Sequence, residues 1–217
     1  MIHQLGSSRR LHGVLACILA AAAGSSASAQ WRVVVLEPGT INRNAKATCV
    51  SATREGGSYD DGYSKPRLWR GAAALGITLS ETRAESGAPV YAHTETLAFG
   101  EGYVRTGPTS GYYAALLWNA DGSAVTIFPP PEGYSEAEGY GAGGDQQVVR
   151  INGDFETHPV MWTGTAESLV SLLPSGFTDG EALATDGVQQ AGNVWSSVAG
   201  VAALWTGTAA SFVNLHP

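Results

Sequence analysis

The sequence predicts an all-β fold: a β-propeller-like array of about four four-stranded repeat units, for which a closed ring and an open or incompletely closed array are the alternatives. Tryptophans recur at Trp69, Trp118, Trp162 and Trp205, with spacings of 49, 44 and 43 residues. A nearly fixed period in this range is typical of propellers, solenoids and repeat arrays. The 28 glycines and 10 prolines indicate many turns, and no segment carries the pattern of a long helix.

The first 29 residues have the three parts of a secretory signal peptide. Arg9 and Arg10 precede an apolar run over residues 11–23, and Ala27-Ser28-Ala29 supplies the cleavage site. A transmembrane anchor is the alternative, but the run ends in small residues that would span a bilayer poorly. We therefore expect a secreted protein, extracellular or periplasmic, whose mature chain has no membrane span.

The mature chain is acidic. The protein has 12 Lys and Arg against 19 Asp and Glu, and Arg9 and Arg10 leave with the signal, so the remaining 188 residues carry a formal charge of −9. This charge argues against nucleic acid and anionic membrane surfaces as partners. The length suits one domain over residues 30–217.

The first element after the signal is a β-branched strand over residues 33–36, which a Pro-Gly turn closes. A similar strand follows each Trp, with apolar residues eight and ten positions beyond it. Residues two apart share one face of a strand, so we expect these pairs in the core: Ile77 and Leu79, Thr126 and Phe128, Val170 and Leu172, Val213 and Leu215. Leu172 and Leu215 in particular are predicted to be buried.

A hairpin precedes the later Trp residues. Asp186-Gly187 and Gly143-Gly144 lie between short apolar runs, where a tight turn needs the positive φ that Gly adopts at little cost. The pairs Gln146-Gln147 and Gln189-Gln190 follow these turns, 43 residues apart. Each unit thus resolves into four strands: one after the Trp, two in the hairpin, and one that carries the next Trp.

Cutting the chain at each Trp gives units 31–69, 70–118, 119–162 and 163–205, with a surplus strand in 206–217. The strands 33–36 and 212–215 are two versions of one strand, so only one can fit a closed ring of four. In an open array, the strand over residues 211–215 would leave an unguarded edge and favour pairing between chains.

The repeat resembles the HAF-type extracellular repeats of bacteria over about residues 31–217. The features that carry the resemblance are a Leu-Trp pair followed by Gly-Thr-Ala, a Leu-x-Pro strand end and a Gln-Gln hairpin. The segments 162–166 and 205–209, Trp-Thr-Gly-Thr-Ala in both, are its clearest part. The resemblance implies propeller-like blades and an extracellular location, and it implies no particular reaction.

No set of residues predicts a catalytic centre. Glu136 and Glu138 lie two apart and could share a strand face as an acid and base pair; a solvated turn is the simpler interpretation, because Asp179 and Glu181 recur one repeat later in what reads as the same loop. His93, His158 and His216 fall in different repeats without metal-ligand spacing. We predict no catalytic residue, metal or cofactor.

Five aromatic residues outside the core register are the candidate binding residues: Tyr112, Tyr113, Tyr134, Tyr140 and Trp195. Exposed at one end of an array, they could stack on sugar rings or anchor a protein partner. Packing between units is the alternative, since large aromatics are mostly buried. We therefore predict a binding or structural module with a glycan or protein ligand. A secreted glycan-active enzyme that uses Glu136 or Glu138 is the alternative.

Overall fold

The computed structural model describes residues 36, 44–60, 64–71, 76–79 and 89–216. The predicted signal peptide and residues 33–35 of the opening strand lie outside this part of the chain. Among the described residues, no helix has the length and apolar character needed to cross a membrane.

The all-β prediction is confirmed. The described chain contains sixteen strands and two short 3-10 turns, Ala166–Ser168 and Ala209–Ser211. Four consecutive strands form one antiparallel meander, and we name the meanders units 1 to 4. The strands are β1 Ala45–Val50, β2 Glu55–Asp60, β3 Ser64–Trp69 and β4 Ile77–Thr78 in unit 1; β5 Val90–His93, β6 Leu97–Arg105, β7 Gly111–Asn119 and β8 Val125–Phe128 in unit 2; β9 Glu136–Gly143, β10 Gln146–Asn152, β11 Thr157–Trp162 and β12 Val170–Ser171 in unit 3; and β13 Asp179–Thr185, β14 Gln190–Trp195, β15 Gly200–Trp205 and β16 Val213–Asn214 in unit 4.

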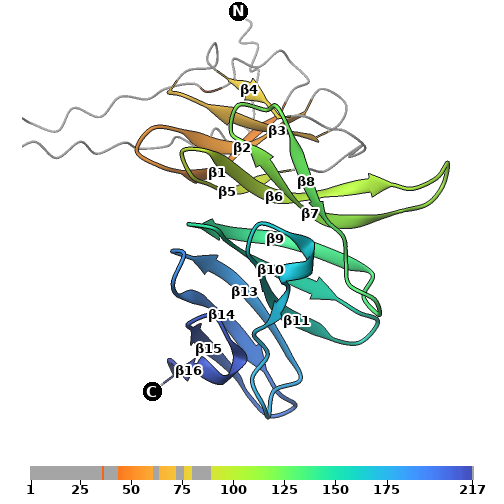
Figure 1. Ribbon diagram of the computed structural model, residues 1–217, viewed down its shortest axis with the longest axis vertical. Coiled ribbons are helices and arrows are strands. Elements are labelled where there is room, and N and C mark those ends of the chain that lie inside the picture. The colour runs from red at the N-terminus through yellow and green to blue at the C-terminus, as the bar shows by residue number, and fades with distance from the viewer. Residues whose placement is uncertain (1–35, 37–43, 61–63, 72–75, 80–88, 217) are drawn as a thin grey trace, which may run out of the picture.

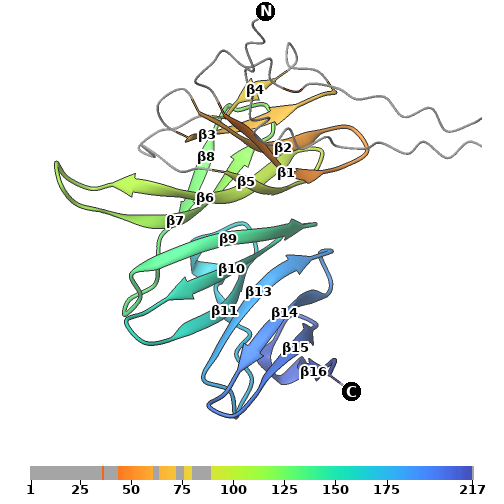
Figure 2. The same ribbon diagram turned by 180° about the vertical axis from the view of Figure 1, so that it is seen from behind.

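The units form three sheets of four, eight and four strands. Units 2 and 3 share the eight-stranded sheet because Tyr113 of β7 pairs in parallel with Glu136 of β9. None of these sheets closes on itself. Units 1 and 4 lie at opposite ends of the longest axis (Figures 1 and 2).

The meanders have different boundaries from the predicted units. The predicted units end at each Trp, whereas each meander also includes the strand that follows its Trp. The strand after each Trp pairs with the strand that carries it, as β16 pairs with β15. In units 3 and 4 this connection contains a glycine with positive φ, Gly164 or Gly207, followed by a 3-10 turn. Gly71, which follows Trp69 at the same distance, also has positive φ. Val213–Asn214 is therefore the fourth strand of the last sheet, not a surplus strand.

The core lies between successive units. The first strand of each unit packs on the unit before it, β9 on β5 to β7 and β13 on β9 to β11. Three apolar clusters fill the three junctions. The four repeated Trp residues are at most 1 % exposed, so their structural role is confirmed.

Some members of the predicted apolar pairs are buried and others are not. The second members Leu79, Phe128 and Leu172 are at most 1 % exposed, but Leu215 is 52 % exposed and Val213 50 %. The prediction that Leu215 is buried is therefore wrong. The register is the predicted one, but among the described residues no unit packs behind unit 4.

Candidate functional site

The acidic residues of β9 lie on a strand and not in a solvated turn, so that simpler interpretation is wrong. Alternation along β9 directs Glu136, Glu138 and Tyr140 to one face, while Ala137 on the other face is fully buried. The Glu138 side chain is 18 % exposed. Glu181, its counterpart one repeat later, lies on β13 and is 17 % exposed.

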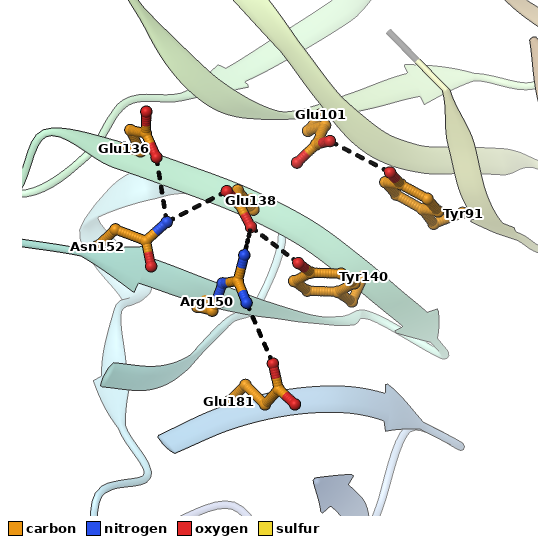
Figure 3. A network of polar contacts seen from close by, with 8 residues as sticks. All are labelled: Tyr91, Glu101, Glu136, Glu138, Tyr140, Arg150, Asn152 and Glu181. Carbon is orange, nitrogen blue, oxygen red and sulfur yellow. Dashed lines mark hydrogen bonds and ion pairs between the residues drawn. The ribbon is translucent and has the colours of Figure 1, made fainter. Parts of the chain in front are cut away.

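Arg150 of β10 joins the acidic residues of two units (Figure 3). It pairs directly with Glu138 across the β9–β10 ladder and forms an ion pair with that carboxylate. Its Nη1 donates to Glu181 Oε2 of unit 4 at 3.3 Å. The Asn152 amide donates to Glu136 and to Glu138, at 3.2 Å each. One guanidinium thus holds two half-buried carboxylates at the junction of units 3 and 4.

Glu101 of β6 brings a further carboxylate to this network from unit 2. Tyr91 of β5 donates a hydrogen bond to Glu101 Oε1 at 3.2 Å (Figure 3). Burial, and then repulsion by Glu138, raises the pKa of Glu101 from an ordinary value of 4.5 to about 7; the Tyr91 hydrogen bond and Arg150 partly offset this rise. Burial and the Glu101 carboxylate raise the pKa of Tyr91 to about 12.

Two tyrosines connect Glu101 to the Arg150 cluster. The rings of Tyr91 and Tyr140 stack with centroids 5.7 Å apart, and the Arg150 guanidinium lies 5.5 Å from the Tyr140 ring centroid. Tyr140 also donates to Glu138 Oε2 at 2.8 Å. The network therefore runs from unit 2 to unit 4, and it is built from contacts between strands.

The chemical capacity of the network lies in the contrast between Glu101 and Glu138. Glu101 has a pKa of about 7 and a phenol as its hydrogen-bond donor, whereas Glu138 forms an ion pair with the Arg150 guanidinium. Carboxyls whose environments differ in this way can act as general acid and base. No group of three or more His, Cys, Asp or Glu within the described ranges is arranged to hold a metal ion.

The structure does not gather the five predicted aromatic residues into one site. Tyr140 belongs to the network. Tyr112 and Tyr113 begin β7, and Tyr112 lines a groove of about 720 Å³ with Arg105 and Ile127. Tyr134 lies just before β9 and its hydroxyl is 2.5 Å from His158 Nδ1, and Trp195 ends β14.

Four of the five nevertheless lie at corresponding ends of their units. The third strand of a unit begins, and the first strand begins and the second ends, at the same end of an antiparallel meander. Tyr112, Tyr113, Tyr134 and Trp195 all occupy such positions. Phe155, in the loop between β10 and β11, joins them there and is 99 % exposed. We call this the aromatic end.

Sequence reasoning missed Glu101, Tyr91 and Arg150, although the repeat carried a signal for them. Tyr91 and Tyr140 are 49 residues apart, and so are Glu101 and Arg150, which is the spacing of Trp69 and Trp118. Extending the register from the Trp residues to the polar positions would have aligned them. The register alone does not show that the side chains of this network contact one another across the junctions. Phe155 was missed because no aromatic residue occupies its position in the other units.

No protein-family model matches the chain, and a search of curated proteins finds no significant match.

Proposed function

We propose that the chain is a secreted binding or structural module built from propeller-like blades of the HAF type. The four-stranded meanders, stacked in series, support the blade-like part of the proposal. The signal-peptide pattern of residues 1–29 supports export, and the acidic charge favours ligands other than nucleic acid.

The observation that carries a binding function is the aromatic end. The exposed large aromatic residues of the described chain are Tyr113 at 38 %, Phe155 at 99 % and Trp195 at 36 %, and all three lie there. Exposed aromatic rings on successive loops suit stacking on sugar rings or anchoring of a protein. A ligand that contacts several units at once would bridge units 2, 3 and 4.

Binding to a panel of polysaccharides and extracellular proteins tests this proposal. We expect the joint variant Tyr113→Ala, Phe155→Ala and Trp195→Ala to lose binding while its circular dichroism spectrum stays unchanged. Val188→Ala is the matched control, since Val188 is 68 % exposed but lies in the β13–β14 hairpin at the opposite end. Equal binding by the joint variant and the parent would overturn a role for the aromatic end.

A glycan-active enzyme is the second candidate, and the raised pKa of Glu101 beside Glu138 is the observation that favours it. In that case Glu101 is the proton donor and Glu138 or Glu136 the carboxylate partner. Polysaccharide turnover that disappears in Glu101→Gln, Glu136→Gln or Glu138→Gln would establish this function. Binding without turnover by the parent protein leaves the binding module as the better account.

A further inference from the structure

The outer face of unit 4 repeats the face that unit 3 uses to bind unit 4. Val148, Met161 and Leu172 of unit 3 are at most 5 % exposed and belong to the cluster that fills the junction of units 3 and 4. The residues 43 positions later are Ala191, Leu204 and Leu215. Ala191 and Leu204 are only half-buried, and Leu215 is 52 % exposed.

The backbone of this outer face is already in the conformation that binds a unit. The Leu172 N–H donates to the Pro159 carbonyl at 2.9 Å, and the Leu215 N–H donates to the Ala202 carbonyl at 2.9 Å. Residues on the face, with Ala184, Ala191 and Leu204 among them, line a groove of about 300 Å³. The face therefore has the same backbone hydrogen bond as the face of unit 3 that receives β13, together with an open groove.

The first strand of unit 1, β1, is exposed at its beginning, whereas the first strands β9 and β13 pack on the unit before them. Ala137 of β9 is fully buried against unit 2, and Gly180 of β13 is buried as well. Ala45 stands at the same register position in β1, opposite Tyr59 of β2, and it is exposed together with Lys46. Ala47 and Trp69 are already buried, which limits the available contact to the beginning of β1.

The charges of the two end units are complementary. Unit 1 has five basic residues against Glu55 and Asp60 among its described residues: Lys46, Arg54, Lys65, Arg67 and Arg70. No Lys or Arg occurs after residue 150, and unit 4 carries Asp179, Glu181 and Asp186. Two outer faces of unit 4 would bring like charges together, whereas unit 1 on unit 4 brings opposite charges together.

The register also specifies which charges meet. In the pairing of the first and second strands, Glu138 lies opposite Arg150, Glu181 opposite Asn193 and Lys46 opposite Ser58. Glu138, Glu181 and Lys46 are equivalent, because each lies one residue before the bulge in the first strand of its unit. Arg150 contacts Glu181 across the junction of units 3 and 4. In a further junction built the same way, Asn193 takes the place of Arg150 and Lys46 that of Glu181, so the Lys46 ammonium faces the Glu181 carboxylate.

We propose that copies of this chain associate head to tail, with β1 of one copy docked on the outer face of unit 4 of another. The two surfaces differ, so the contact is heterologous and each added copy presents a new docking surface. The association joins faces of sheets, and it differs from pairing along the β16 edge. It is independent of the aromatic end.

Sedimentation velocity of the purified protein over a range of concentrations tests the proposal. We expect dimers and larger species for the parent. Leu215→Glu should raise the apparent dissociation constant about tenfold or more, and so should Lys46→Glu. Val198→Glu is the matched control, since Val198 is 90 % exposed in the β14–β15 loop, and should associate like the parent. Val213→Glu replaces Leu215→Glu if the latter unfolds.

Mixing the two defective variants decides the orientation. Leu215→Glu keeps an intact β1 and Lys46→Glu keeps an intact unit 4 face, so an equimolar mixture should form dimers and nothing larger. A monomeric parent at every concentration would overturn the proposal. Dimers formed by Lys46→Glu alone with the dissociation constant of the parent would also overturn it and would indicate contact between two unit 4 faces.

Discussion

At the scale of single residues, the half-buried carboxylates of the network differ in the partners that surround them. Glu138 and Glu181 share the Arg150 guanidinium, whereas Glu101 has a phenol as its hydrogen-bond donor. A phenol cannot supply the countercharge that a buried carboxylate needs. The pKa of Glu101 is therefore well above its ordinary value in the folded protein.

This difference predicts a pH dependence of stability. The pKa of Glu101 is about 7 in the folded protein, against an ordinary value of 4.5, so between these values the folded state binds more protons. The resulting stabilisation is complete below about pH 4.5 and is lost as the pH rises through 7. We expect the parent to lose on the order of 1 to 3 kcal/mol of unfolding free energy over this window from Glu101.

Urea unfolding at a series of pH values measures this effect, with Glu101→Gln as the comparison. Glutamine keeps a neutral side chain that can accept the Tyr91 hydrogen bond, so the variant should be less sensitive to pH between 4.5 and 7. Parallel curves for the two proteins would show that Glu101 does not titrate abnormally.

At the scale of the elements, a buried glutamine connects the hairpin of a unit to the turn after its Trp. Gln190 is fully buried and pairs with Trp205. Its Oε1 accepts from the Gly207 N–H at 2.7 Å, as Gln147 accepts from Gly164 in unit 3. Glu55 does the same for Gly71 in unit 1. One side chain thus fixes the turn that brings the fourth strand beside the third.

Unit 2 shows what replaces this connection. Ala98 stands opposite Trp118, where the other units have Glu or Gln. The backbone adjusts, and the Ala120 N–H donates to the Thr96 carbonyl at 2.8 Å. The sequence shows the Gln repeat but not its partner, because the hydrogen bond joins a strand of the hairpin to the turn after the Trp, and only the folded sheet brings these together.

Gln190→Ala should therefore destabilise the protein by about 1 to 3 kcal/mol, since it removes a fully buried amide and leaves the Gly207 N–H without its side-chain acceptor. Gln189→Ala is the matched control: Gln189 is adjacent but exposed, and its replacement should change stability by no more than about 0.5 kcal/mol. Thermal unfolding of both variants measures the difference. Equal destabilisation by the two would show that the buried amide has no special role.

At the scale of the whole molecule, the four-strand repeat could be predicted because apolar spacing and turn residues are local signals. The register placed Phe128 and Leu172 in the core correctly, and both are fully buried. It failed at Leu215, because burial depends on what packs behind a strand and not on the strand itself. The acidic network was misread for the same reason, since its partners lie on neighbouring units.

The contrast between Leu172 and Leu215 gives a stability test. Leu172→Ala leaves a cavity in the junction of units 3 and 4 and should cost about 2 to 5 kcal/mol. Leu215→Ala removes a side chain that is already half exposed and should cost about 1 kcal/mol or less. Thermal unfolding at low protein concentration measures both. Similar losses for the two variants would mean that the outer face of unit 4 is covered in solution.

A stack of units in which each contacts only its neighbours should also lose structure from its uncovered end. Unit 3 is covered on both faces: Val149 and Ile151 belong to the cluster with unit 2, and Val148 to the cluster with unit 4. The amides of Leu172 and Leu215 make hydrogen bonds of equal length to equivalent carbonyls, so any difference in their hydrogen exchange reports the covering unit and not the bond.

At low protein concentration we expect the Leu215 amide to exchange about tenfold faster than the Leu172 amide or more, through local opening of β15 and β16. If copies stack as proposed, raising the concentration should slow exchange at Leu215 and leave Leu172 unchanged. Equal protection at low concentration would contradict an uncovered end, and protection that ignores concentration would count against the stacking of copies.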